Sequence, residues 1–402
     1  MGMNSSSTAD YRDNTALSDF FIQEIRLSSQ WEGPLQLVSG LYYEDIQKEL
    51  HTFWSWGGDP SGNLYPNPES PRSKFDRVDK TEQKAIFGEL SYHFTEQWEG
   101  TVGGRYFDYE VDSEASLIFR GNDLPQDLKG VEETGQNYKA AVNYAANEDL
   151  LIYGQWAEGF RLGRPQALSP RCASAIDAGV VDDISGVESD TSSTFELGVK
   201  SSWNDNRITL NAAIYHTDWE DIPIRTSTAG PDGICSRLVN AGEAKSEGVE
   251  VEFRARLTDN VQLDISASTV DATLENDVDF GGGLSGEKGD DLPGSADYNA
   301  TVGLEYGFIL GSYPSFARLD YAYVGEYYNN LQEEGTSAGD FGQVHVKLGS
   351  TIGQFDVDVF VNNLTNDDGL TWVEDNFKRF SGTSPAYRIR PRSIGINIGY
   401  SF

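Results

Sequence analysis

The chain has 402 residues and a formal net charge of −34, because 64 Asp and Glu residues outnumber 30 Lys and Arg residues. This excess of acidic groups excludes a general nucleic-acid-binding protein, since contacts to phosphates need clustered cations. Aromatic residues make up 12% of the chain, and the mean hydropathy of −0.47 is compatible with membrane strands that expose only alternate residues to lipid.

Stretches in which apolar and polar residues alternate recur along the whole chain. In one of them, Ile208, Leu210, Ala212 and Ile214 are separated by single residues. Because the side chains of a strand alternate between its two faces, each stretch has one apolar and one polar face. Each is near or above the ~9–11 residues with which a tilted strand crosses a bilayer. In chain order, about fifteen strands are predicted, over residues 20–31, 34–48, 81–94, 98–112, 134–146, 149–162, 191–203, 207–225, 239–258, 261–276, 295–307, 315–328, 341–352, 355–364 and 388–402.

Short and long connections alternate between these predicted strands. Asn204–Asn206 and Thr258–Asn260 are tight polar turns, whereas most of the prolines fall in the long connections. Short turns on one side and long loops on the other are typical of a barrel that crosses an outer membrane. The long connections are predicted over residues 49–80, 113–133, 163–190, 226–238, 277–294, 329–340 and 365–387.

These features predict an all-β fold, a transmembrane antiparallel up-and-down β-barrel with short periplasmic turns and long extracellular loops. Residues 20–402 form one partial barrel in this interpretation, without a linker that would separate two domains. The strand count is odd, and a closed barrel of this kind with both termini on one side needs an even number. We therefore expect further strands before residue 20, and residues 1–19 to be a loop remnant or a disordered start.

The chain offers little that predicts chemistry. Its two cysteines, Cys172 and Cys235, both fall in predicted long connections, so they lie on the same side of the barrel. Either a disulfide or two free thiols would fit this placement. The four histidines are scattered, so we predict no metal site, and no nucleophile stands with a base that would activate it. The sequence therefore predicts a protein that is not an enzyme and holds no cofactor.

Aromatic and arginine side chains of the long connections and upper strands are the candidates for binding a ligand. Aromatic rings supply stacking surface, and arginines supply paired donors for carboxylate or catecholate oxygens. For each of them, a place in a hydrated loop, in an aromatic belt or in pairing across the lumen is the alternative. The candidates are Trp54, Trp56, Tyr65, Arg161, Arg164, Trp372, Arg379 and Arg388.

Several short segments carry a resemblance to a known family. The last strand ends in Tyr400-Ser401-Phe402, which resembles the assembly signal of bacterial outer-membrane proteins, although a plain C-terminal edge strand is the alternative. Together with other segments, it resembles the C-terminal barrel part of TonB-dependent outer-membrane receptors of the ferric-siderophore type. The segments that carry this resemblance are Phe21–Leu27, Trp31–Leu35, Gly40–Tyr43, Glu158–Gly163, Phe195–Lys200, Asn240–Gly242, Glu247–Glu250 and Asn362–Asn366.

The resemblance implies a place in the outer membrane of a Gram-negative bacterium and a function in the uptake of a scarce nutrient, most often a ferric siderophore. Its barrel has about 22 strands around a plug, and neither the plug nor the first strands are recognised in this sequence. The implied partners are outer-membrane lipid, the extracellular ligand, the assembly machinery, and TonB acting only through a plug. We therefore expect no transport by this chain alone. A passive porin-like channel and a β-rich surface adhesion module are the alternatives.

Overall fold

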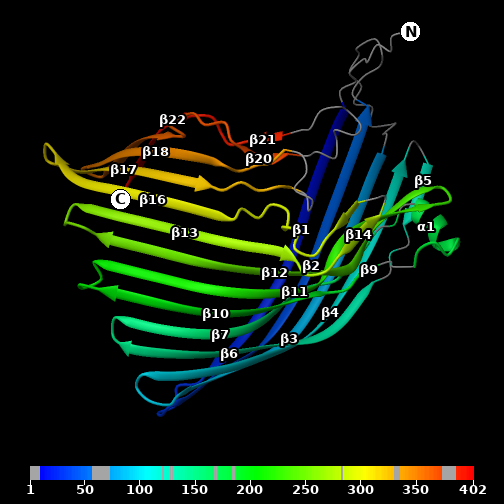
Figure 1. Ribbon diagram of the computed structural model, residues 1–402, viewed down its shortest axis with the longest axis horizontal. Coiled ribbons are helices and arrows are strands. Elements are labelled where there is room, and N and C mark those ends of the chain that lie inside the picture. Colours follow the sequence, from blue (N-terminus) through cyan, green and yellow to red (C-terminus); the bar gives the residue numbers. More distant parts are fainter. Residues whose placement is uncertain are drawn as a thin grey trace, which may run out of the picture.

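A single curved antiparallel sheet makes up most of the structure (Figure 1). The computed structural model describes residues 10–56, 73–119, 122–126, 128, 130–166, 168, 170–182, 186–281, 284–329, 336–373 and 386–402. Within these residues the sheet has sixteen strands, because β5 (Asn122–Gln126) pairs with β4 beside the main path. The strands of the main path are, in order, β1 (Asp10–Ser28), β2 (Leu35–Trp56), β3 (Ser73–His93), β4 (Trp98–Phe119), β6 (Val131–Asn147), β7 (Leu150–Arg161), β10 (Asp190–Trp203), β11 (Ile208–Gly230), β12 (Gly233–Arg256), β13 (Val261–Leu274), β16 (Tyr298–Leu310), β17 (Tyr313–Val324), β18 (Phe341–Ile352), β19 (Phe355–Asn362) and β22 (Ser393–Tyr400).

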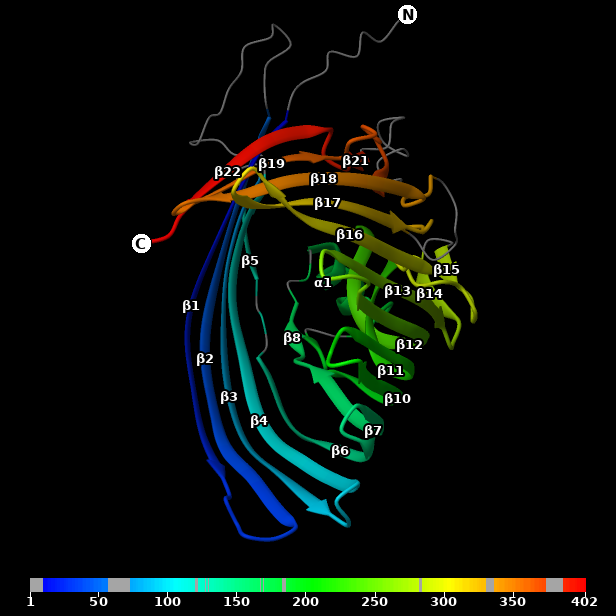
Figure 2. The ribbon, with the colours of Figure 1, turned by 90° about the vertical axis from the view of Figure 1, so that its left-hand side faces the viewer.

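The long connections carry short elements of their own. Three two-stranded sheets and one helix lie off the main sheet: β8 (Arg164–Pro165) with β9 (Gly186–Val187), β14 (Val278–Gly281) with β15 (Leu284–Gly286), β20 (Leu370–Val373) with β21 (Ala386–Arg388), and α1 (Pro170–Asp177). In the described part of the chain, no helix has the length and apolar character needed to span a bilayer. Figure 2 shows that α1 and β8 lie inside the curve of the sheet, so this connection occupies its concave side.

Strands that follow one another on the main path also follow one another in sequence, and every pair is antiparallel. The predicted up-and-down barrel wall of about fifteen strands is therefore confirmed. Figure 1 shows tight turns at the left-hand ends of the strands and the longer connections at the right-hand ends. In the turn between β10 and β11, Asn204, Asp205 and Asn206 have φ angles of 55°, 56° and 63°. Asn and Asp tolerate this left-handed region better than other residues with side chains, which explains the tight turn.

The two faces of the sheet differ in polarity. Leu197 lies opposite Ile214, which lies opposite Val249, and all three side chains are exposed. Because residues that are directly paired across strands share a face, they form a continuous apolar band on the convex side. Aromatic side chains flank this band near the turns and again higher up, as in the girdles of membrane barrels. Exposed examples are Trp98, Trp203, Tyr306 and Phe355 near the turns, and Tyr106, Phe195, Tyr298 and Tyr321 higher up.

Several strands are longer than predicted. β1 begins at Asp10, not at residue 20, and Asp10 pairs with Trp56. Of the predicted loop remnant 1–19, residues 10–19 are therefore strand, and residues 1–9 lie outside the described part of the chain. β2 and β3 likewise extend into the predicted connection 49–80. These extensions lie beyond the ~9–11 residues that cross a bilayer. Neither of their faces meets hydrocarbon there, so no apolar alternation marks them in the sequence.

The predicted connection 226–238 is also corrected by the structure. β11 runs to Gly230 and β12 starts at Gly233, so only Pro231 and Asp232 separate them. Gly233 has a φ of 122°, a value that a residue with a Cβ rarely adopts. The strands therefore form one long hairpin that projects far past the apolar band, and Cys235 belongs to strand β12.

Candidate functional site

A cluster of Arg161, Asp190 and Trp219 lies on the concave face of the sheet. Arg161 is the last residue of β7 and Asp190 the first of β10, and the register pairs them directly. The Arg161 Nε donates to the Asp190 Oδ1 and Oδ2 at 3.0 and 2.9 Å, and Nη2 donates to Oδ2. The Trp219 Nε1 donates to the same Oδ2 at 2.6 Å. Asp190 is 3% exposed, so its carboxylate is a buried anchor for both side chains.

The neighbouring strand β11 positions Trp219. A register shift between Trp219 and Ile222 interrupts the β11–β12 ladder, and such bulges turn nearby side chains away from the regular pleat. The Arg161 Cζ lies 4.6 Å from the centroid of the Trp219 ring, within the range of a cation–π interaction. The indole thus holds the guanidinium on one side, while Asp190 holds it along one edge.

The cluster lines a cavity of about 370 Å³. The other residues that line it include Ser192, Thr217, Lys245, Ser246 and Leu292. The Arg161 side chain is 62% exposed although Asp190 is buried, so the guanidinium reaches solvent with donors that Asp190 does not use. An arginine fixed in this way is suited to binding oxygen anions, and the tryptophan face is suited to stacking on a planar group.

The connection between β7 and β10 is tied to the sheet close to this cavity. The Gly163 N–H donates to the hydroxyl of Tyr109, a fully buried residue of β4, at 2.8 Å. At the far end of the connection, the Ser189 N–H donates to the Glu133 Oε1 at 3.0 Å. These bonds fix the connection two residues after Arg161 and one residue before Asp190, so β4 and β6 preorganise the site.

Further contacts hold the same connection to β3 and β12. The Arg77 Nη2 donates to the Pro165 carbonyl at 2.9 Å. The Gln166 side chain donates to the Leu238 carbonyl and accepts from the Leu238 N–H, both at 2.8 Å. Cys172 of α1 and Cys235 of β12 form a disulfide with a Cα–Cα distance of 4.4 Å, and both cysteines are fully buried.

The structure distributes the other predicted ligand-binding residues over separate places. Arg164 lies in β8, exposed, in the same connection that follows Arg161. Trp372 of β20 and Arg388 of β21 belong to one two-stranded sheet, and the Arg388 Nη1 donates to the Asp368 carboxylate at 2.8 Å. The side chains of Trp54 and Trp56 are outside the described part, and so are the residues Tyr65 and Arg379.

The proposed assembly signal lies on the last strand of the sheet. The Tyr400 hydroxyl donates to the Gln354 Oε1 at 2.7 Å, and the rings of Tyr400 and Phe402 are 5.3 Å apart. Both side chains are exposed, Tyr400 as the last residue of the edge strand β22 and Phe402 two residues beyond it, and both the assembly role and a plain edge strand fit this placement.

Sequence reasoning missed Asp190 and Trp219. Asp190 is the last residue of the predicted connection 163–190, and neither it nor Trp219 is among the predicted ligand-binding residues. The sequence contains a signal for Asp190. Arg161 and Asp190 stand at the two ends of one connection between antiparallel strands, and such a connection brings the end of one strand beside the start of the next. Nothing in the sequence marked the bulge that positions Trp219. Among the described residues, no group of three or more His, Cys, Asp or Glu side chains is placed to hold a metal ion.

The sheet and its site define a class, a transmembrane β-barrel wall with a polar cavity on its concave face. The chain belongs to the TonB-dependent receptor family, because the family model "TonB dependent receptor-like, beta-barrel" matches residues 2–364. The resemblance predicted from the sequence is thereby confirmed.

Curated relatives with similar sequences are receptors. The pesticin receptor of Yersinia enterocolitica serotype O:8 / biotype 1B is 22% identical over 394 residues, which cover 95% of this chain and 51% of that receptor. The metal-pseudopaline receptor CntO of Pseudomonas aeruginosa is 22% identical over 255 residues, 62% of this chain and 33% of that receptor. The chain thus spans about half the length of the pesticin receptor, and its match covers a third of CntO.

Solved structures share the fold. The ferric yersiniabactin uptake receptor FyuA from Yersinia pestis matches with a TM-score of 0.77 and 18% identity, over 98% of this chain and 55% of that chain. The copper transporter OprC matches with a TM-score of 0.69 and 14% identity, over 97% of this chain and 58% of that chain. The relatives and neighbours are receptors and transporters rather than enzymes.

Proposed function

We propose that this chain forms the wall and external loops of a Gram-negative outer-membrane receptor that takes up a ferric siderophore or a similar scarce metal complex. The family and the names of the relatives support the receptor class. The observation that carries the ligand class is the Arg161–Asp190–Trp219 cavity, with an exposed guanidinium beside an indole face.

The chemistry of this cavity fits a ligand that is planar and rich in oxygen anions. Asp190 neutralises one edge of the Arg161 guanidinium, and the remaining N–H groups are free to donate to a carboxylate or catecholate. Ser192 and Thr217 add hydroxyl groups, while Trp219 offers a ring for stacking. TonB-driven uptake, in this proposal, requires a plug in addition to the wall described here.

A passive channel is the second candidate function. It is favoured by the β7–β10 connection, which lies inside the curve of the sheet and is bonded to β3, β4, β6 and β12. A connection fixed in this way narrows a lumen. Concentration-dependent saturable binding distinguishes the two candidates, because a passive channel conducts solutes without retaining one of them.

The test is a binding titration of a panel of ferric siderophores against the folded full chain in detergent. We expect saturable quenching of tryptophan fluorescence, and Arg161→Lys to weaken it about tenfold, since a charge-assisted hydrogen bond contributes ~1.5–3 kcal/mol. Arg207→Lys is the matched control, because Arg207 lies at the short-turn end and pairs with the exposed Asp259. Equal binding by both variants would remove Arg161 from the site, and absence of saturation would favour the passive channel.

A further inference from the structure

A second cavity adjoins the Arg161 cavity on the inner side of the sheet. Its volume is about 510 Å³, and its walls include residues of β4, β6 and the upper part of β7. Gly159 and Phe160 of β7 line both cavities, so the two meet across this strand. We name the second one the Arg105 cavity, after the arginine of β4 that lines it.

The register shows that Arg105 and Arg161 lie on the same face of the sheet. Gly103 lies opposite Lys139, and Lys139 opposite Ala157, so these three residues share a face. Arg105 stands two residues after Gly103 and Arg161 four residues after Ala157, so both keep this face, which is the concave one. Because two strand spacings separate β4 from β7, the two arginines are on the order of 10 Å apart.

The surface between the two arginines is low. The ladder between β6 and β7 ends at Lys139 and Ala157, and from there the concave side of β7 carries only Ala157 and Gly159 before Arg161 is reached. A Cβ built on Gly159 would come within 2.9 Å of the Ser192 hydroxyl oxygen. A larger residue at this position would therefore fill the passage, whereas the glycine leaves room for one ligand to reach across both cavities.

Arg105 is held in the same manner as Arg161. Its Cζ lies 4.8 Å from the centroid of the Tyr42 ring, and the Arg161 Cζ lies 4.6 Å from that of Trp219. The Arg105 Nη2 donates to the Gln83 Oε1 at 3.4 Å, a long bond to a neutral amide. The Arg105 Nε is buried and has no hydrogen-bond partner among the described residues. A buried charged donor without an acceptor is costly, so this edge of the guanidinium is suited to an oxygen anion.

The other charged side chains of the Arg105 cavity already have partners. Two ion pairs account for its other cations, Arg26 with Glu24 and Lys139 with Glu89. The remaining carboxylate, that of Glu158, accepts from the Tyr138 N–H at 2.9 Å. Within the described part of the chain, Arg105 is therefore the cation of this cavity that no carboxylate neutralises.

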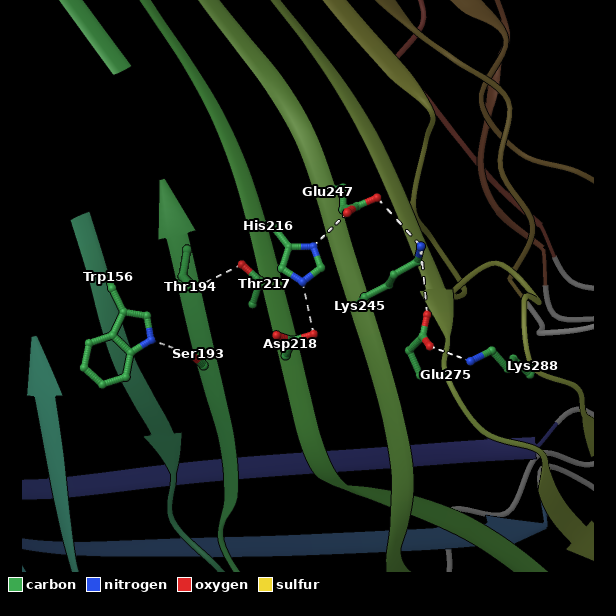
Figure 3. A network of polar contacts seen from close by, with 10 residues as sticks. All are labelled: Trp156, Ser193, Thr194, His216, Thr217, Asp218, Lys245, Glu247, Glu275 and Lys288. Carbon is green, nitrogen blue, oxygen red and sulfur yellow. Dashed lines mark hydrogen bonds and ion pairs between the residues drawn. The ribbon is translucent and has the colours of Figure 1, made fainter. Parts of the chain in front are cut away.

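The Arg161 cavity offers no comparable second cation. Lys245 also lines it, but the Lys245 ammonium lies 3.7 Å from Glu247 and 3.9 Å from Glu275 (Figure 3). Two carboxylates thus already balance this charge. A ligand with a second anionic group finds its better partner in Arg105, on the other side of β7.

We propose that the ligand occupies both cavities and is an elongated metal complex with a free carboxylate, or a similar oxygen anion, remote from its chelating oxygens. The chelating oxygens accept from Arg161 beside Trp219, and the free carboxylate reaches over Gly159 and accepts from Arg105. This inference rests on the proposed function and narrows the class of ligand. A compact complex in which every anionic oxygen binds the metal leaves Arg105 without an acceptor.

Calorimetric titration of the folded full chain in detergent with two matched probes tests the inference. One probe is biphenyl with a single terminal carboxylate, and the other is biphenyl with a carboxylate at each end. We expect the chain to bind the dicarboxylate at least about tenfold more tightly, because a second charge-assisted hydrogen bond forms within the same complex. Equal affinity for the two probes would overturn the inference.

The variant Arg105→Met removes the donors and keeps an unbranched side chain against Tyr42. It should bind the dicarboxylate about tenfold more weakly and the monocarboxylate unchanged, because only the second anion loses its partner. Arg254→Met is the matched control, since Arg254 is an exposed arginine of the same concave face, near the short turns, and pairs with Asp264. No loss in Arg105→Met, or an equal loss in both variants, would contradict the second subsite.

The variant Gly159→Leu tests the passage without touching Arg105. It should remove the preference for the dicarboxylate, and a preference that persists would show that the two cavities are not bridged. Urea titration separates binding from a structural role, because a guanidinium without a carboxylate partner should leave the unfolding midpoint unchanged in Arg105→Met. If that variant instead loses stability and binds both probes equally more weakly, Arg105 belongs to the scaffold and the inference fails.

The inference and the proposed function fail in different ways. A chain that binds the monocarboxylate, loses this binding in Arg161→Lys and shows no preference for the dicarboxylate refutes only the second subsite. A chain that binds neither probe refutes the Arg161 site as well.

Discussion

At the scale of single residues, Asp190 organises the concave site. Its buried carboxylate accepts from Arg161 and from the Trp219 indole, so one side chain fixes a cation and a stacking ring at once. A buried acceptor that holds two donors is costly to replace, because the donors lose a charged partner and stay poorly solvated. The chemistry proposed for Arg161 therefore depends on a residue that need not touch the ligand.

The substitution Asp190→Asn tests this dependence. We expect it to lower the free energy of unfolding by about 1–3 kcal/mol, the usual cost of disrupting a buried charged hydrogen bond. Urea titration of the folded chain in detergent measures the change. Asp259→Asn is the control, since Asp259 is an exposed partner of Arg207 and an exposed pair contributes at most ~1 kcal/mol. Equal effects of the two substitutions would contradict the role of Asp190.

His51 provides a second prediction at the residue scale. It lies in the extension of β2 beyond the bilayer, where the hydrogen bond from its Nδ1 to Asp76, 2.8 Å long, raises the pKa of its imidazole. Because the pKa of His51 is raised in the folded state, the pairing makes its full contribution to stability at pH values below the ordinary histidine pKa near 6.5. That contribution is lost as the pH rises through the raised value.

Hydrogen exchange checks the effect of His51. We compare each exchange rate with the intrinsic rate of an unprotected amide at the same pH. On this scale, the amides in the outer parts of β2 and β3 should exchange faster above the raised pKa of His51 than below pH 6.5. Asp76→Asn should remove this pH dependence, because it removes the main cause of the shift. The same pH dependence in that variant would show that another group is responsible.

At the scale of elements, the strands differ in how far the sequence revealed them. Within the bilayer, side chains such as Ile208, Leu210 and Ile214 alternate strictly, because one face meets hydrocarbon and the other the lumen. The extensions of β1, β2 and β3 have hydrocarbon on neither face, so pairing rather than alternation defines them. Sequence periodicity therefore predicted the membrane part of each strand and missed the part outside.

The candidate site shows the same limit in another form. The sequence predicts Arg161, because the chemistry of arginine and a place near the end of the predicted strand 149–162 are both visible in it. The sequence does not predict the anchoring of the β7–β10 connection, because Tyr109 and Gln166 bond to backbone groups that any residue offers. Side-chain bonds to distant backbone atoms leave no pattern of residue types, and only the fold brings them together.

The disulfide gives a prediction for the element α1. Replacing Cys172 and Cys235 together by serine should release α1 from β12 and reduce the protection of its amides at least about tenfold, since a disulfide contributes ~2–4 kcal/mol. The amides of Gly163 and Ser189 should keep their protection, because Tyr109 and Glu133 hold them independently. Hydrogen exchange with and without reductant measures both. Simultaneous loss of protection over the whole connection would show that the disulfide holds it alone.

At the scale of the whole molecule, the sheet of the described residues has two edges. β1 and β22 each have one neighbour on the main path, and β1 presents an edge of 19 residues. Unpaired N–H and C=O groups along such an edge pair readily with other strands. A wall of this kind is stable in a membrane only when its edges are covered, by further strands or by another chain.

This arrangement predicts association of the isolated chain. Residues 1–402 refolded into detergent should form oligomers through the β1 edge, and light scattering coupled to size exclusion measures their mass. Ile22→Pro, in the middle of β1, should weaken this association, because the Ser29 N–H bonds to the Leu37 carbonyl of the β2 side and the N–H groups at even positions such as Ile22 therefore point outward. Phe21→Pro is the contrast, since the Phe21 N–H points toward β2 and its loss should destabilise the β1–β2 ladder instead. A monodisperse monomer of the unmodified chain would contradict an open edge.

The account as a whole depends on the convex apolar face meeting hydrocarbon, and spin labels in bilayers test this most directly. Labels at Val249→Cys and Leu304→Cys, on the convex face, should be relaxed by oxygen and protected from a water-soluble nickel complex. A label at Glu250→Cys, which the pleat turns to the concave face, should show the reverse. Convex labels that the nickel complex reaches, or that oxygen does not reach, would contradict the membrane wall.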